Sequence, residues 1–146
     1  MLKKMNKKGF TLAELLIVVA IIGVLVAISI PIFRSQLEKA REATDEANIR
    51  SIYAQLSADV LTENTTSTKK DKDVCPAAVT YTVTKDKDTG NITGTATYTM
   101  TQKTAGLVGG GSVTIGSVTI YSWDFKLGTA TITIKDDGSA PSIKIQ

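Results

Sequence analysis

The sequence predicts an α+β protein in which one long N-terminal helix packs, through its C-terminal half, against a small antiparallel β-sheet. The first observation is an apolar stretch, Leu15 to Phe33, with no charge in 19 consecutive positions. The second is a helical spacing of apolar and small side chains that continues to Leu61. The third is a change after Asp73 to alternating Thr, Val and Ile, which is typical of half-buried strands. Only about 85 residues follow Leu61, few for a self-sufficient core, so the sheet is expected to use the helix as packing surface.

The apolar stretch is long enough to cross a membrane. As a helix it spans ~28 Å, close to the thickness of a bilayer's hydrocarbon core. Gly23 lowers its regularity, and Pro31, which lacks an N–H, is expected to kink it near its end. A secretory signal sequence is the alternative, but no small-residue cleavage site follows the apolar run. Four lysines precede the stretch and only Arg34 follows closely, which places the N-terminus in the cytoplasm and the remainder outside.

One acid, Glu14, lies at the edge of this stretch. Carrying a carboxylate to the bilayer centre costs on the order of 2.5 to 3.5 kcal/mol. Glu14 is therefore expected to have a partner, and the nature of that partner bears directly on function.

Beyond Arg34 the helical pattern has two apolar edges. One is a narrow stripe that we expect to pack closely against other helices, with a charged stalk exposed to water as the alternative: Leu37, Ala40, Thr44, Ala47, Ser51, Ala54, Ala58 and Leu61. The other is where a sheet is expected to sit: Ile49, Ile52, Tyr53, Leu56 and Val60. Charged side chains cover the remaining faces (Glu38, Lys39, Arg41, Glu42, Asp45 and Glu46), and Glu46 stands in the favoured order for an ion pair with Arg50.

The second half of the chain predicts a linker loop over residues 62–78 and an antiparallel sheet domain over residues 79–146. The expected strands are Val79–Lys85, Ile92–Thr101, Val113–Lys126 with an interruption at Gly116-Ser117, Thr129–Lys135 and Ser142–Ile145. One face carries Val, Ile and aromatic side chains for the helix, and the other is rich in Thr for solvent. The loop 86–91 faintly resembles a calcium loop, but Asn91 and Thr97 stand where an EF-hand needs Gly and Glu, so a plain hairpin is expected.

The composition excludes several classes of chemistry. The chain has no His and a single Cys, Cys75, so triads with His, zinc sites of the Cys/His type and an intrachain disulfide cannot be built. We therefore expect no catalytic residue, no metal, no cofactor and no enzymatic activity. The net charge of +3 comes from the N-terminal lysines, since the remaining chain has 13 basic and 14 acidic side chains. Specific nucleic-acid binding is accordingly not predicted.

The segment KKGFTLAELLIVVAIIGVLVAISIPIF, residues 7–33, resembles the class III signal and N-terminal helix of type IV pilins. The resemblance implies a leader peptide, residues 1–9, that a membrane prepilin peptidase removes after Gly9, leaving Phe10 as an N-methylated N-terminus. It further implies that Glu14 is the family's assembly glutamate, Gly23 a helix-loosening glycine and Pro31 the kink proline. Residues 10–33 then form the hydrophobic transmembrane and assembly helix, and residues 34–61 its amphipathic continuation. With only Cys75, the chain departs from the disulfide-closed C-terminal loop common in the family.

This resemblance implies a pilin, a structural subunit that polymerises through its N-terminal helix into an extracellular filament for adhesion or motility. The partners implied are further copies of the chain, the prepilin peptidase, the pilus assembly platform, minor pilins and, before assembly, the cytoplasmic membrane. Cleavage creates an amine on Phe10 that Glu14 of a neighbouring copy can pair with. The alternative is a pseudopilin of a type II secretion or competence DNA-uptake system. A membrane-anchored binding module that never polymerises is a third possibility, but it gives Glu14 no partner.

Overall fold

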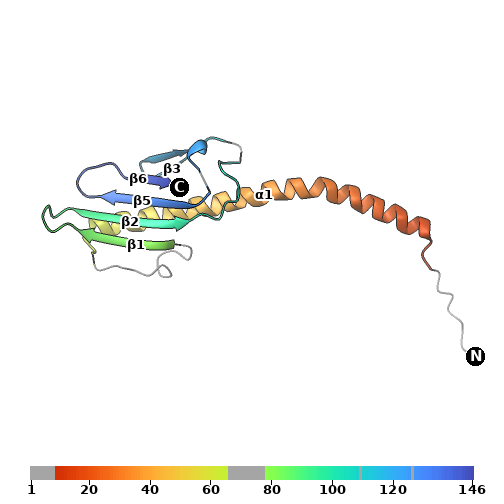
Figure 1. Ribbon diagram of the computed structural model, residues 1–146, viewed down its shortest axis with the longest axis horizontal. Helices are drawn as coiled ribbons and strands as arrows, with labels where there is room; N and C mark the ends of the chain where they lie inside the picture. The colour runs from red at the N-terminus through yellow and green to blue at the C-terminus, as the bar shows by residue number, and fades with distance from the viewer. Residues whose placement is uncertain (1–8, 66–77, 109, 126) are drawn as a thin grey trace, which may run out of the picture. The chain divides into compact units, whose positions relative to one another are not determined.

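The computed structural model describes residues 9–65, 78–108, 110–125 and 127–146 (Figure 1). The chain divides after Gln36 into two compact units, which we describe separately, and the helix α1, Leu12–Leu61, belongs to both. The leader residues 1–8 and Cys75 lie outside the described residues, as does most of the predicted linker.

The first unit consists of the N-terminal part of α1. It contains an 18-residue window of mean hydropathy 3.1, none of it buried, which by length and composition suffices to cross a membrane. The helix α1 continues without interruption through Pro31. Ser29 satisfies its hydroxyl locally by donating to the Leu25 carbonyl oxygen at 2.7 Å. The kink at Pro31 therefore stays a prediction.

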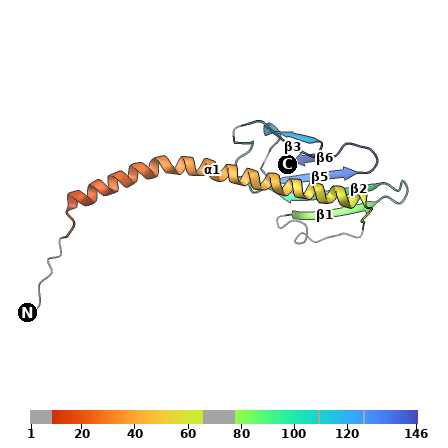
Figure 2. The same ribbon diagram turned by 180° about the vertical axis from the view of Figure 1, so that it is seen from behind.

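The second unit packs the part of α1 that starts at Leu37 against a four-stranded antiparallel sheet. The strands are β1 (Ala78–Lys85), β2 (Ile92–Thr99), β5 (Thr129–Lys135) and β6 (Ser142–Ile145), in the order β1-β2-β5-β6. A separate two-stranded hairpin consists of β3 (Ser112–Ile115) and β4 (Val118–Tyr121). Figures 1 and 2 show this part of α1 lying across one face of the sheet. The predicted α+β class is confirmed.

Alternation along the strands separates a core face from a solvent face. In β2, Ile92, Gly94, Ala96 and Tyr98 are buried, while the Thr residues between them are half-buried or exposed. From α1, four side chains meet this face in the core: Ile49, Ile52, Leu56 and Val60. These four belong to the apolar edge that was expected to lie under the sheet. The opposite stripe, from Leu37 to Leu61, is exposed in the subunit, and its packing against other helices stays a prediction.

Two expected strands end differently. β2 stops at Thr99 rather than Thr101, because the N–H of Thr101 donates to the Asp45 carboxylate instead of to a strand. The predicted strand Val113–Lys126 is wrong beyond Tyr121, where a 3₁₀ helix, η1 (Ser122–Asp124), follows β4. This turn lets the chain bury Phe125, whose carbonyl oxygen accepts from the N–H of Gly106 at 2.9 Å.

The loop 86–91 is the predicted hairpin. Asp86 closes it, because its carboxylate accepts the N–H groups of Asp88 at 2.9 Å and Thr89 at 2.8 Å. Gly90 takes the left-handed conformation, with φ of 78°, that such a reversal requires. The Glu46–Arg50 ion pair is also present on the helix, at 2.5 Å.

Candidate assembly helix and its anchored loop

A capping box begins α1 at the residues of interest for assembly. The Thr11 N–H and hydroxyl donate to Glu14 Oε2 at 2.8 and 2.7 Å, and the Glu14 N–H donates back to Thr11 Oγ1 at 3.2 Å. This reciprocal pairing satisfies N–H groups that a helix leaves unpaired in its first turn. Within one subunit, the partner of Glu14 is therefore Thr11. The T-x-x-E spacing that encodes this cap is visible in the sequence, from Thr11 to Glu14.

Gly9 and Phe10 precede the cap and lie open. Phe10 is 84% exposed, and a Cβ added at Gly9 meets no atom within 4 Å. Gly23 is equally free of neighbours within 4 Å. Gly9 and Phe10 are thus exposed before the helix. Among the described residues, no contact requires glycine at position 9 or at position 23.

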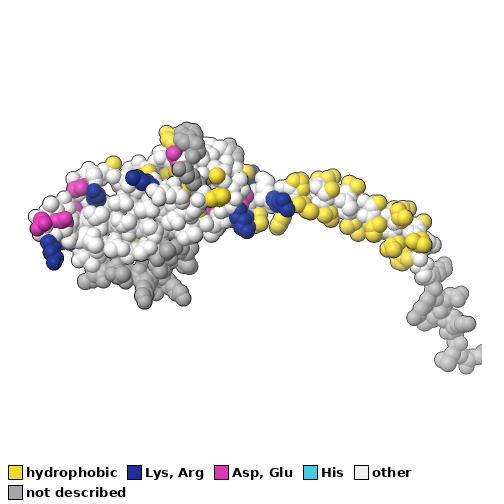
Figure 3. All heavy atoms as spheres, in the orientation of Figure 1, with side chains coloured by type: hydrophobic (Ala, Val, Ile, Leu, Met, Phe, Trp, Pro, Cys, Tyr) yellow, Lys and Arg dark blue, Asp and Glu magenta, His cyan; other side chains and the backbone are white. Residues whose placement is uncertain are grey.

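The apolar surface of the first unit has no cover in the subunit. Every described side chain from Leu12 to Gln36 is exposed, and Figure 3 shows hydrophobic side chains along the whole of this part of α1. At ~25 cal/mol per Å² of apolar surface, leaving such a helix in water is strongly unfavourable. A contiguous apolar surface of this size marks a membrane or protein interaction site.

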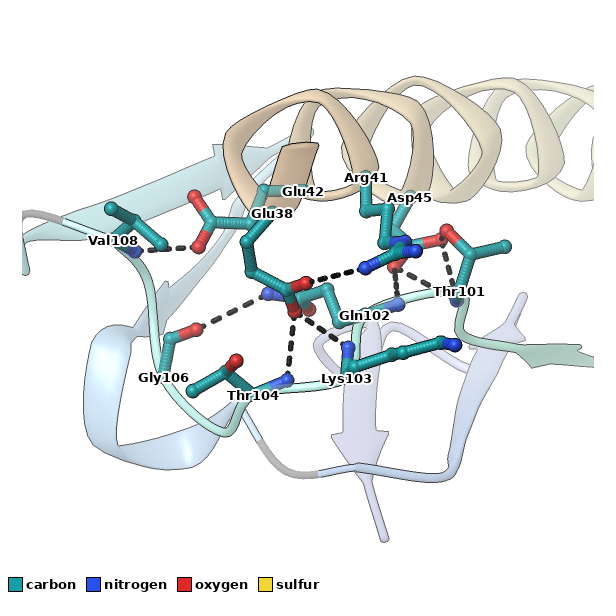
Figure 4. Close-up of polar contacts among 10 residues, drawn as sticks. All are labelled: Glu38, Arg41, Glu42, Asp45, Thr101, Gln102, Lys103, Thr104, Gly106 and Val108. Carbon is teal, nitrogen blue, oxygen red and sulfur yellow. Dashed lines mark hydrogen bonds and ion pairs between the residues drawn. The ribbon is translucent and has the colours of Figure 1, made fainter. Parts of the chain in front are cut away.

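In the second unit, acids of α1 hold the 101–108 loop, which follows β2 (Figure 4). Asp45 is 0% exposed, and its carboxylate accepts the N–H of Thr101 at 2.9 Å, the N–H of Gln102 at 3.0 Å and the hydroxyl of Tyr98 at 2.6 Å. The Thr101 hydroxyl also donates to it, at 2.8 Å. Burial of this charge is offset because every contact is a donor.

Glu38 and Glu42 extend the same arrangement along the helix. Glu38 Oε1 accepts the N–H groups of Lys103 at 2.5 Å and Thr104 at 2.7 Å, and its Oε2 pairs with Arg41 at 3.0 Å. Glu42 accepts the N–H of Val108 at 2.5 Å. Burial raises the pKa of Glu38, but the two backbone donors and Arg41 lower it by more, so the pKa lies below its usual value. The Lys103 and Thr104 amides are therefore bound to an ionised carboxylate.

These acids correct one sequence-based expectation. Glu38 and Asp45 were expected among charged residues covering the outer faces of the helix, but they are 6% and 0% exposed. Their spacing with Glu42, at i, i+4 and i+7, places all three on one helical face, and this is the sequence signal from which a shared partner could have been inferred. The partner itself lies more than 50 residues away in the sequence, at Thr101 and beyond.

A second buried acid closes the end of α1. Asp59 accepts the Tyr81 hydroxyl at 2.5 Å and the side-chain amides of Gln55 and Asn64, each at 3.3 Å. Burial and the neighbouring Asp59 carboxylate raise the pKa of Tyr81 well above its usual value. Among the described residues, no group of three or more His, Cys, Asp or Glu side chains is arranged to hold a metal ion.

Comparisons with known proteins identify the N-terminal segment. The family model described as the prokaryotic N-terminal methylation motif matches residues 4–30. The chain is 49% identical over 53 residues to the type IV narrow pilus major component PilA5 of Thermus thermophilus. This match covers 34% of this chain and 46% of the relative. Over 48 residues it is 46% identical to the type IV major pilin protein PilA of Myxococcus xanthus, which is 33% of this chain and 22% of the relative. The N-terminal segment of the chain is therefore similar to that of type IV pilins.

The names of these relatives describe structural components of pili or fimbriae. A third, the fimbrial protein EcpB of Eikenella corrodens, is 54% identical over 36 residues, 25% of this chain and 23% of the relative. All three are pilus or fimbrial components and not enzymes, in agreement with the expectation of a non-enzymatic protein. The chain spans less than half the length of each of these relatives. No solved structure matches it significantly.

Proposed function

We propose that this chain is a pilin subunit that is cleaved between Gly9 and Phe10, N-methylated at Phe10, and polymerised through α1 into an extracellular filament for adhesion or motility. The observation that carries the proposal is the uncovered apolar surface of α1, with Glu14 at its edge. A bilayer covers this surface before assembly, and neighbouring helices cover it in a filament. The match of residues 4–30 to the N-terminal methylation motif and the similarity to pilus components support the same proposal.

In this proposal Glu14 has two successive roles. In the free subunit it caps α1 through Thr11. In the filament it accepts the cationic amine of Phe10 on a neighbouring copy, which sets the register of the subunits while apolar packing supplies most of the cohesion. Its capping oxygen is Oε2, so Oε1 is available to a second donor.

The proposed path through the cell follows from the N-terminal charge. The four leader lysines hold the N-terminus in the cytoplasm, and the sheet domain lies outside as part of a single-pass membrane protein. A prepilin peptidase, an assembly platform and minor pilins are the proposed partners. Gly23 and Pro31 are proposed to loosen the helix as it moves from membrane to filament.

Two substitutions separate the capping role of Glu14 from the pairing role. Glu14→Gln keeps the cap, because Gln serves at this position of a capping box, but it removes the charge. Thr11→Ala removes the cap and keeps the charge. We expect Glu14→Gln to be processed and inserted normally yet to yield few filaments, and Thr11→Ala to yield near-normal filaments, both counted by electron microscopy.

Several outcomes contradict the proposal. Normal filament yield from Glu14→Gln excludes charge pairing, and loss of filaments in Thr11→Ala alone assigns Glu14 to capping. Gly9→Val is expected to leave an unshortened band on a gel, and unchanged cleavage contradicts the processing site. An antibody to the sheet domain is expected to decorate long surface fibres. Label confined to the cell envelope favours the pseudopilin instead.

A further inference from the structure

The 101–108 loop is held to α1 by charge to an unusual degree. Five of its main-chain N–H groups donate to carboxylates of the helix: those of Thr101, Gln102, Lys103, Thr104 and Val108. Hydrogen bonds to an ionised acceptor are roughly twice as strong as neutral ones. At Glu38 the attachment therefore depends on the carboxylate staying ionised, unlike the backbone ladders of the neighbouring sheet.

The other side of the loop is tied by groups that do not titrate. Gly106 N–H donates to the Phe125 carbonyl oxygen, and Leu107 N–H donates to the Ser122 hydroxyl, both at 2.9 Å. Inside the loop, the Gln102 side-chain amide donates to the Gly106 carbonyl oxygen at 3.2 Å. Loss of the carboxylate contacts thus leaves the loop's own structure and its link to η1 in place.

The charged and titratable groups around the fastening come from three elements. On α1, Arg41 pairs with Glu38. On β2, the Tyr98 hydroxyl donates to Asp45. On the loop, the Lys103 side chain extends away from Glu38 (Figure 4). A proton added to Glu38 enters a space already filled with donors, so protonation opposes the contacts rather than replacing them.

We propose that Glu38 is an acid-releasable fastening: its protonation detaches residues 103 and 104 of the loop from α1 while the four-stranded sheet stays folded. The sheet is held by an apolar core, chiefly Ile, Val, Tyr and Leu, whose packing does not change with proton binding in this range. The two states of the element are the fastened and the released loop, and the proton is the ligand that shifts their populations. This proposal does not depend on polymerisation.

The direction of the pH dependence follows from the geometry. Because the donors hold the pKa of Glu38 below its ordinary value, the fastening is fully present above the ordinary glutamate pKa of about 4.3 and is lost as pH falls through the lower folded value. Release is therefore an acid-side event, and the loop stays fastened at neutral pH.

Amide hydrogen exchange of the full-length chain in detergent micelles tests the proposal. Protection factors, corrected for the intrinsic pH dependence of exchange, are compared for the loop amides and for β2 and β5 between pH 6 and pH 3. We expect the protection of the Lys103 and Thr104 amides to fall as pH drops, with the sheet amides unchanged. Simultaneous loss in loop and sheet, or full loop protection at pH 3, overturns the proposal.

A matched pair of variants distinguishes the charge from a general effect on the helix. Glu38→Gln is expected to lower the protection of the Lys103 and Thr104 amides about tenfold at neutral pH, since a neutral acceptor replaces a charged one. Glu46→Gln is the control, because Glu46 pairs with Arg50 on the same helix, and no described loop amide donates to it. Equal protection in both variants contradicts the proposal. Glu38→Gln is used rather than Asp45→Asn because Asp45 is the more buried of the two acids. The test therefore stays valid even if Asp45→Asn fails to fold.

Discussion

Gly94 permits the close approach of β2 to α1, and replacing it by Ala is expected to destabilise the sheet domain. A Cβ added there lies 2.8 Å from Leu56 Cδ1 and 2.8 Å from Val60 Cγ2. Both side chains belong to the buried core, at 0% and 3% exposure, so neither moves without disturbing its neighbours. Overpacking of this kind costs ~1–3 kcal/mol, and the smaller unfolded-state entropy of Ala returns ~0.4–1 kcal/mol. The net expectation is a loss of about 1–2 kcal/mol.

Thermal unfolding of the full-length chain in detergent, followed by the near-ultraviolet circular dichroism of the tyrosines, measures this loss. At ~4–8 °C per kcal/mol for a small domain, Gly94→Ala is expected to lower Tm by about 5–12 °C. Thr95→Ala, on the solvent face of the same strand, is the control and is expected to have a smaller effect. Unchanged Tm in Gly94→Ala refutes the reasoning.

A double variant tests the stated cause. Val60→Ala removes one of the two groups that the new methyl meets, so Gly94→Ala and Val60→Ala together are expected to cost less than the sum of the single losses. Additive losses show instead that the cost of Gly94→Ala does not arise from its contact with Val60.

Three further outcomes follow from individual contacts. Gly116→Ala is expected to displace the β3–β4 hairpin, because φ at position 116 is 59° and the added Cβ overlaps the Tyr53 ring. Amide hydrogen exchange checks this: protection is expected to be lost in the hairpin and kept in β2. Tyr81→Phe is expected to cost ~1–3 kcal/mol by leaving Asp59 short of a buried donor. Since the Tyr81 pKa is raised by folding, wild-type stability falls as pH rises above about 10, and denaturant titrations are expected to show a shallower fall in the variant. Thr11→Ala is expected to fray the first turn of α1 at a cost of ~1 kcal/mol, visible as a local gain in amide exchange.

The parts of the fold that sequence predicted well are those with local causes. The helix from the apolar stretch to Leu61 follows from a repeating pattern of apolar residues, and each turn of that pattern depends only on residues close together in the sequence. The strands Thr129–Lys135 and Ser142–Ile145 follow from alternation bounded by turn residues. The assembly residues followed from a resemblance of the N-terminal segment, and Phe10 and Glu14 keep their assembly role as a proposal.

The parts that sequence missed depend on partners distant in the chain. The sequence pattern predicts Asp45 as a surface charge on a helix, but in the structure it accepts the N–H groups of Thr101 and Gln102. The same contact ends β2 at Thr99. The η1 turn follows β4 because Phe125 is buried and Gly106 bonds its carbonyl oxygen, which alternation in the sequence does not encode.

By itself, the sequence determined a membrane-length apolar helix, the α+β class and a face of the helix reserved for the sheet, and its charge asymmetry predicts the orientation across a membrane. Hydrophobic periodicity and charge asymmetry are properties of neighbouring residues, so they can be read before folding. Only the tertiary structure decided which acids of α1 are buried, and that they bind the 101–108 loop. A buried carboxylate is tolerated only where donors surround it, and those donors come from segments that folding alone brings together.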